Sequence, residues 1–155
     1  MKPLFAKRNR VVAVILVLGC VVLTGALARD SVVLRRKLME SNNSVVAEAL
    51  NKAVKEKNFA EIEGKCDVIL ENMDKVLDLF PAGSLSENSR AKPEIWERWK
   101  EFSKHPANVR KAAQELAAAA RTGDEEAVKV RFKALGRACK SCHESFRAPK
   151  PKQGT

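Results

Sequence analysis

The residues with the most distinctive chemistry lie near the end of the chain, in the run Cys139-Lys140-Ser141-Cys142-His143. The spacing C-x-x-C-H is the pattern through which haem c is attached to a protein. If this run is helical, residues three and four apart share one face. Cys139 and Cys142 could then each bond a haem vinyl group, while His143 ligates the iron. The motif therefore predicts one covalently held haem with His143 as its proximal ligand.

Three other kinds of site are less compatible with the sequence. A thiol–disulfide module places its cysteines near a βαβ pattern, and no strand pattern is evident in this chain. A zinc site needs about four ligands, whereas only two cysteines and one histidine cluster here. A disulfide between Cys139 and Cys142 would be strained within a helix. Haem attachment is the interpretation that remains.

The elements that position the motif follow from the apolar spacing, which predicts an all-α protein. Four amphipathic stretches cover residues 32–57, 60–79, 93–120 and 125–148. His105-Pro106 interrupts the third stretch, so we expect a kink or a short break there. Short links between long helices favour antiparallel neighbours, and we expect an up-down-up-down four-helix bundle.

Antiparallel order brings the end of the fourth helix close to the start of the third and the end of the second. Beyond the first 28 residues the chain has seven aromatic residues, and five of them are expected at this common end. They are Phe80, Trp96, Trp99, Phe102 and Phe146. Large side chains can line a wide pocket, whereas the alanines at the opposite end let helices close up. The sequence therefore predicts a cavity for a large flat group beside the end of the fourth helix.

The N-terminal segment, residues 1–28, has the three parts of an export signal. Four basic residues precede an apolar run that starts at Val11 and contains one polar residue, Thr24. The run ends in Ala26-Leu27-Ala28, and small residues at these positions are typical of a signal-peptidase site. We expect cleavage after Ala28 and a periplasmic protein.

Two alternatives to cleavage stay open. The apolar run of 18 residues is just long enough to act as an uncleaved membrane tether, and Cys20 lies in a stretch similar to a lipoprotein site. Under any of these interpretations, residues 29–148 form the haem domain. Residues 149–155, rich in lysine and proline, are expected to be a disordered tail.

The net charge and its distribution along the chain indicate which kinds of partner this protein binds. The chain carries a net charge of +10, and residues 1–28 contain four basic and no acidic residues, so the remainder carries +6. Its basic residues are scattered among acids, which is typical of a solvated surface rather than a nucleic-acid face. We expect no nucleic-acid partner. A mildly basic surface would favour an acidic redox partner.

Three stretches strengthen the case for haem: residues 79–84 (LFPAGS), 91–97 (AKPEIWE) and 139–147 (CKSCHESFR). Together they resemble class II cytochrome c, the family of cytochrome c′ and its low-spin relatives, over nearly all of residues 31–148. The resemblance implies a four-helix bundle, frequent homodimers and a periplasmic setting. By position, it implies that Met39 is the distal residue, that Arg35 lies near a haem propionate and that Arg147 lies beside the proximal histidine.

Met39 decides between two mechanisms. It lies seven residues past Val32, about 10 Å along the first helix, and His143 lies about 6 Å from Arg147 along the fourth. Both therefore fall at nearly one level, where a thioether could be the sixth ligand. We expect single-electron transfer by low-spin His/Met iron, with redox proteins of the periplasm as partners. The alternative is a five-coordinate cytochrome c′ that binds small gases such as nitric oxide.

Other residues have simpler interpretations. The sequence offers no proton-shuttling histidine or carboxylate pair near the motif, so we do not expect an enzyme. Cys66 and Met73 lie on the apolar stripe of the second helix and are expected to be buried, Cys66 as a free thiol. His105 precedes a proline and is expected to be exposed. Lys140 and Glu144 flank the motif and are expected to face solvent.

Overall fold

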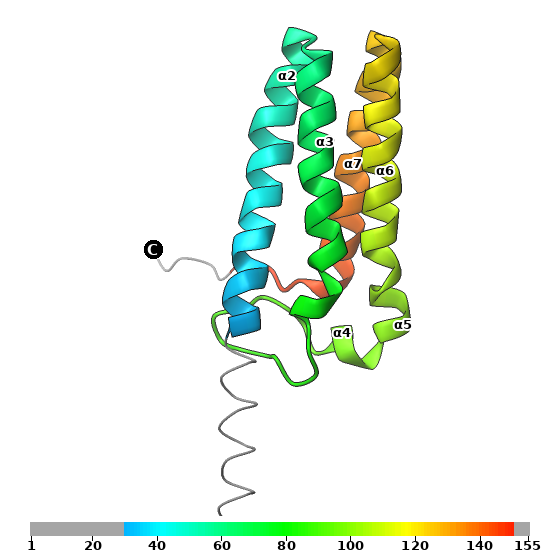
Figure 1. Ribbon diagram of the computed structural model, residues 1–155. Helices are drawn as coiled ribbons and strands as arrows, with labels where there is room; N and C mark the ends of the chain where they lie inside the picture. The colour runs from blue at the N-terminus through cyan, green and yellow to red at the C-terminus, as the bar shows by residue number, and fades with distance from the viewer. Residues whose placement is uncertain (1–29, 151–155) are drawn as a thin grey trace, which may run out of the picture.

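The computed structural model describes residues 30–150, which form a bundle of long helices lying side by side (Figure 1). The first helix covers residues 30–56: an α-helical segment 30–44, a π-helical turn η1 (Val45–Leu50) and α2 (Asn51–Glu56). The other elements are α3 (Phe59–Lys75), the 3₁₀ turn η2 (Leu77–Leu79), α4 (Glu94–Glu97), α5 (Trp99–Phe102), α6 (Lys104–Thr122) and α7 (Glu125–Phe146).

The long helices alternate in direction, as expected. In Figure 1 the first helix and α6 rise from the lower end, whereas α3 and α7 descend to it. The predicted four-helix bundle is confirmed. The predicted signal of residues 1–28 and the last five residues lie outside the part that is described. Within residues 30–150, no helix combines the length and apolar character needed to cross a bilayer.

Local chemistry explains the two turns at the upper end. Asn58 caps α3 by accepting a hydrogen bond from Glu61 N at 3.2 Å, and Asp124 caps α7 by accepting one from Ala127 N at 2.9 Å. Short polar side chains satisfy amide groups that have no partner within the helix. Gly123 ends α6 with φ of 69°, a conformation that glycine adopts at no steric cost. Aspartate directly before a helix is a favoured cap, so the role of Asp124 agrees with its residue type.

The third helix differs from the prediction in where it breaks. The interruptions fall at Arg98 and Ser103, which separate α4, α5 and α6, and not at His105-Pro106. Pro106 is buried in the first turn of α6. There the missing N–H of proline removes no helical hydrogen bond, because the first four amides of a helix have no partner within it. The expected kink at this proline is therefore wrong.

The core runs the length of the bundle and changes composition from end to end. Toward its upper end α6 buries mainly alanine, and α6 packs closely against both α3 and α7. At the lower end aromatic rings meet: Phe102 lies 4.8 Å from Phe80, 5.5 Å from Trp99 and 5.4 Å from Phe146, centroid to centroid. Phe80, Phe102 and Phe146 are buried in this cluster. The five aromatics thus gather where expected, and Phe80, Trp96 and Trp99 also line an open groove of about 450 Å³.

Candidate haem site

The C-x-x-C-H motif occupies the last two turns of α7. Cys139 and Cys142 are free thiols, both half-buried and both packed against the bundle core. Burial raises the pKa of Cys139, and burial followed by the neighbouring Cys139 raises the pKa of Cys142 to about 11. Both sulfurs are therefore protonated at neutral pH and are placed at the edge of the core. Among residues 30–150 no three metal-ligating side chains cluster.

His143 is half-buried one helical turn beyond Cys139. Burial, and then the positive charge of Arg90, lower the pKa of His143 below its ordinary value. The imidazole is thus neutral at neutral pH, which is the form that binds a metal. Arg90 is a residue that the sequence analysis did not single out, because it belongs to a loop far from the motif.

A glycine opens the face of α7 on which His143 lies. Gly136, Cys139 and His143 recur at spacings of three and four, so they share one side of the helix. A Cβ atom placed on Gly136 would meet nothing within 4 Å. Gly136 therefore leaves open space beside the backbone on the side of α7 that carries Cys139 and His143, where a flat group has room to lie close to the helix; Gly64 on α3 has equal space. The spacing of Gly136 from Cys139 and His143 is visible in the sequence, although Gly136 was not among the predicted site residues.

A short backbone clasp holds the end of α7. Ala91 and Arg147 form an isolated antiparallel bridge, in which Lys92 N donates to Phe146 O at 3.1 Å and Ala148 N donates to Arg90 O at 2.7 Å. The Lys92 ammonium also donates to the last-turn carbonyls of α7, 3.1 Å from that of Ser145. A cation at this position is favoured by the helix dipole. The clasp fixes the turn that carries His143 and brings Arg90 beside it.

Arg35 lies on the first helix and is 3% exposed. Its guanidinium donates to Ser84 Oγ at 2.9 Å, Ser84 O at 2.6 Å and Ser89 Oγ at 2.8 Å, and more distantly to Leu79 O. It lies 4.8 Å from the Phe80 ring, and no carboxylate pairs with it among the residues that the structure describes. Arg35 therefore anchors the loop between η2 and α4. Only its Nε–H is left for a propionate.

The remaining predicted residues have mixed outcomes. Met39 is half-buried and packs against the same core as Cys139 and Cys142. The amide of Arg147 donates to His143 O at 3.1 Å, but its side chain is exposed, so a role of the guanidinium beside the proximal histidine stays a prediction. His105 is half-buried with its ring 5.5 Å from that of Phe146, so the expectation that it is exposed is wrong. It forms part of the aromatic cluster.

Three simpler expectations are confirmed. Cys66 is fully buried, and burial raises the pKa of its thiol to about 12. Met73 is 8% exposed and belongs to the core. Lys140 and Glu144 are exposed and form an ion pair at 3.3 Å. None of these residues needs a role in the site.

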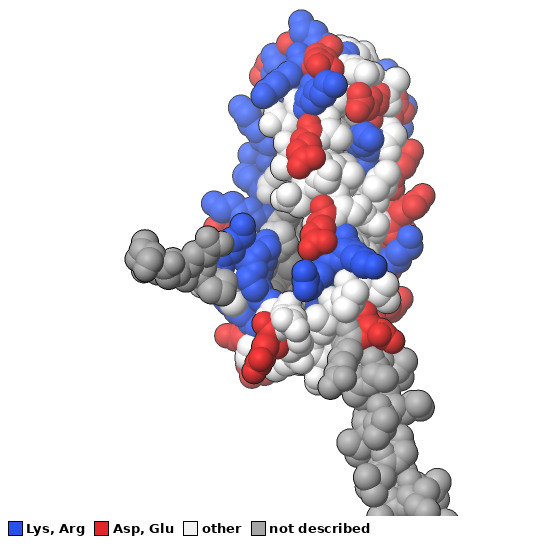
Figure 2. All heavy atoms as spheres, turned by 90° about the vertical axis from the view of Figure 1, so that its left-hand side faces the viewer, with Lys and Arg blue, Asp and Glu red and all other residues white. Residues whose placement is uncertain are grey.

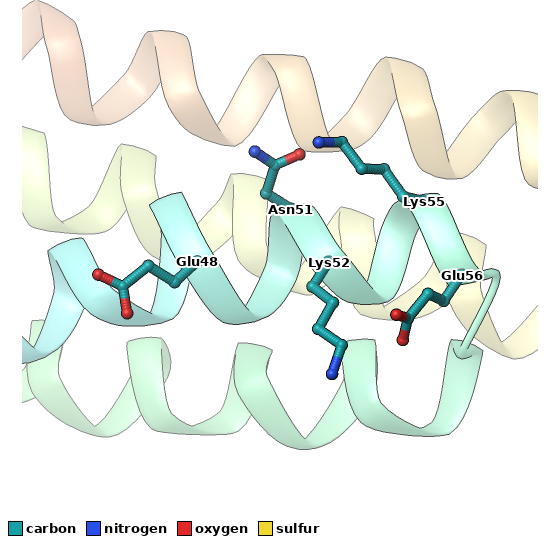
Figure 3. Close-up of a pocket in the computed structure, with 5 residues that line it drawn as sticks. All are labelled: Glu48, Asn51, Lys52, Lys55 and Glu56. Atoms are coloured by element: carbon teal, nitrogen blue, oxygen red, sulfur yellow. The ribbon is translucent and has the colours of Figure 1, made fainter.

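The surface is hollowed on the side of the first helix. Figure 2 shows this face with a hollow in its lower half, around which Lys and Arg side chains gather. By contrast, the groove of about 220 Å³ in Figure 3 lies near the upper end, along η1 and α2. Its side chains fan out in different directions and all come from one helix (Glu48, Asn51, Lys52, Lys55 and Glu56). They do not converge on a ligand, so this groove is not the site.

Comparison with known proteins agrees with this geometry. The family model for cytochrome c′ matches residues 30–147. The cytochrome c′ of Rhodospirillum rubrum is 38% identical over 77 residues, which are 49% of this chain and 52% of that protein. The chain thus aligns with about half the length of that relative.

Solved structures extend the likeness over the bundle. A cytochrome c′ described as having an unusual ligand-controlled dimer dissociation is 29% identical, with a TM-score of 0.71. A nitric oxide complex of a variant cytochrome c′ from Alcaligenes xylosoxidans is 25% identical, also with a TM-score of 0.71. Each match covers 79% of this chain and 97% of the other.

A four-helix bundle that ends its last helix in C-x-x-C-H defines a class II c-type cytochrome. The chain belongs to the cytochrome c′ family, and its cofactor is covalent haem c. Three features of the structure fit that group: free thiols at the edge of the core, the open side of α7 at Gly136, and a buried arginine without a carboxylate partner. The thiols suit the vinyl groups, the open side suits the flat ring, and the cation suits a propionate.

Proposed function

We propose that this protein carries single electrons in the periplasm, using haem held by Cys139 and Cys142 and ligated by His143 and Met39. The observation that carries the proposal is the position of Met39. Its side chain packs at the edge of the same core as the two thiols, on the helix that faces the open hollow. Its neighbour Leu38 is 9% exposed, whereas Met39 is only half-buried, so the Met39 side chain reaches the edge of the core.

Each residue has a distinct task in this proposal. The bound haem supplies the one-electron couple between ferric and ferrous iron. Cys139 and Cys142 hold the ring to α7, and neutral His143 donates its lone pair from the turn that the clasp fixes. Arg90 contributes positive charge beside His143, which favours the more reduced state. Met39 closes the opposite side with a soft sulfur ligand, which also favours ferrous iron.

The second candidate function is gas binding at an open distal side. It is supported by the structural likeness to a cytochrome c′ whose nitric oxide complex has been solved. In that case Met39 would pack beside the ring without bonding to iron. Neither candidate requires a catalytic residue, and we propose that the protein is not an enzyme.

The ferric spectrum separates the two candidates. With Met39 bound, the purified holoprotein should be low-spin and show the weak near-infrared band of methionine ligation. Met39→Leu should turn it high-spin, remove that band and accelerate carbon monoxide binding, while keeping most of the packing volume. Met73→Leu is the matched control, since Met73 lies in the core of α3 and should leave the spectrum unchanged. A high-spin unmutated protein would favour gas binding.

Location and assembly belong to the same proposal. Residues 1–28 would direct export and be removed after Ala28, which places the haem domain in the periplasm. N-terminal sequencing of the native protein should begin at Arg29. A start at Met1 or at a modified Cys20 would instead show a membrane tether. Redox proteins of the same compartment would be its partners, and a homodimer would follow the family resemblance.

A further inference from the structure

Charge is divided unequally between two helices of the bundle. Residues 127–150, which cover most of α7 and the segment after it, contain seven Lys or Arg and a single Glu. In α3 the balance is reversed, with five acidic residues and two Lys. Because α7 also begins with Glu125 and Glu126, its positive charge is gathered in the part that carries the haem motif, from residue 127 onward.

The basic residues of α7 form a stripe along its outer side. Lys129, Lys133, Arg137 and Lys140 recur at spacings of four, four and three, and all are exposed. Lys129 pairs with Glu125 at 2.7 Å, and Lys140 pairs with Glu144. Lys133 and Arg137 have no ion pair within residues 30–150. The centre of the stripe is thus free to attract a negatively charged surface.

The stripe borders the haem side of the helix. Arg137 adjoins Gly136 in sequence, and Lys140 lies three residues before His143 on a neighbouring side of α7. Figure 2, a view of the side of the first helix, shows Lys and Arg side chains down the left edge and around the hollow, with Asp and Glu side chains mainly toward the middle and right. An approaching anion would be drawn to the side of α7 that adjoins the haem motif.

The kind of partner follows from the lack of apolar side chains along the stripe. Surfaces that bind membranes pair cations with exposed apolar residues that enter the lipid. Within the described part of α7, the only large apolar side chain that is well exposed is Val130. A rigid helical stripe of cations is better matched by a rigid acidic surface, because charge complementarity steers and orients protein partners.

We infer that the α7 stripe, centred on Lys133 and Arg137, is where an acidic electron-transfer protein docks. This inference rests on the proposed electron-carrier function. One electron passes in the docked complex: the partner is oxidised by one electron and the haem iron is reduced from ferric to ferrous, with no bond made or broken. The stripe brings the two redox groups together and does not take part in the transfer.

The test uses the ferric holoprotein and reduced plant-type [2Fe–2S] ferredoxin, an acidic one-electron donor. The double variant Lys133→Glu/Arg137→Glu should be reduced about tenfold more slowly at low ionic strength, since steering changes association rates by roughly 10- to 1000-fold. The control is Lys75→Glu/Lys111→Glu, on α3 and α6, which changes the net charge equally and disrupts no ion pair among residues 30–150. It should keep the unmutated rate, and high salt should abolish the difference.

Further measurements distinguish a wrong docking site from a wrong carrier function. Hexaammineruthenium(II), a small cationic donor, reduces an electron carrier without needing the stripe, so it should reduce all variants. If it does so but both double variants slow ferredoxin equally, the docking site is wrong and the carrier function stands. If the unmutated protein is high-spin and ruthenium reduces it only slowly, the carrier function itself fails. If the stripe variant loses binding only to phosphatidylglycerol vesicles, the stripe meets a membrane and the proposal is overturned.

Discussion

The two sides of the haem site are built in different ways. On the α7 side the helix is capped by Asp124, packs closely on α6, and is held at its end by the clasp to residues 90–92. On the opposite side, the first helix continues without a break through the π-helical turn η1 into α2. Its contribution to the site is the half-buried Met39 and a buried arginine that is already engaged with a loop.

This difference separates attachment of the haem, which depends on α7, from tuning of the iron, which would depend on the first helix. The α7 side holds the ring through residues whose spacing is set within one helix, so its geometry does not depend on other elements. In the proposed site, the first helix meets the ring across the bundle, and Met39 would decide whether the iron has a sixth ligand. Members of one family can therefore share an attachment motif and still differ in ligand chemistry.

The largest expected effect comes from the α7 side. Cys139→Ala/Cys142→Ala should abolish covalent attachment, because no other thiol of the described chain lies within reach of the ring; Cys66 is fully buried in α3. The measurement is intact mass after acid–acetone extraction of protein from a host that matures c-type cytochromes. The Cys66→Ala variant is the control and should retain one haem. A haem mass retained by the double variant would show that the motif is not the attachment point.

A smaller effect is expected from the opposite side, at Arg35. Arg35→Leu removes the donors of three short hydrogen bonds and leaves buried Ser84 unsatisfied. At about 1 kcal/mol for each hydrogen bond, we expect the free energy of unfolding in urea to fall by about 3 kcal/mol, with faster proteolysis of the loop around Ser84. Haem should stay attached.

The matched control is Arg36→Leu. Arg36 is exposed and reaches Glu40 only at 3.8 Å, and an exposed pair of this kind contributes about 0–1 kcal/mol. Equal losses for both variants would contradict the loop-anchoring role. Loss of bound haem in Arg35→Leu alone would instead mean that the arginine serves the propionate first.

The smallest expected effect tests the open side of α7. Gly64→Ala on α3 should stabilise the protein by up to about 1 kcal/mol, because alanine is the better helix former and the added Cβ meets nothing within 4 Å. Gly136→Ala has equal space in the structure, but its methyl group would press on the ring. We expect no gain in the holoprotein and a shifted Soret band. Identical gains at the two sites would show that the ring lies on another side of α7.

The outcome at these residues shows how far the sequence alone could be interpreted. The helices, the Asp124 cap, the buried Cys66 and the haem motif were predictable because each depends on spacing within one helix or on the chemistry of adjacent residues. The spacing of Gly136 from the motif is visible in the sequence, although Gly136 was not among the predicted site residues. The expected kink at Pro106 was wrong because the sequence around a proline does not show where the preceding helix ends. Here α5 ends at Phe102, which leaves Pro106 in the first turn of α6.

The sequence by itself determined what the protein can hold, since C-x-x-C-H in a helix presents two thiols and an imidazole whatever surrounds them. The tertiary structure alone decided what faces that group. Arg90 acts on His143 only because the loop at residues 90–92 pairs with residues 146–148, and Arg35 is buried only because Ser84 and Ser89 fold over it. Contacts between residues about 50 positions apart depend on the path of the loop that joins them. A loop has no repeating backbone geometry, so its path produces no periodic pattern in the sequence.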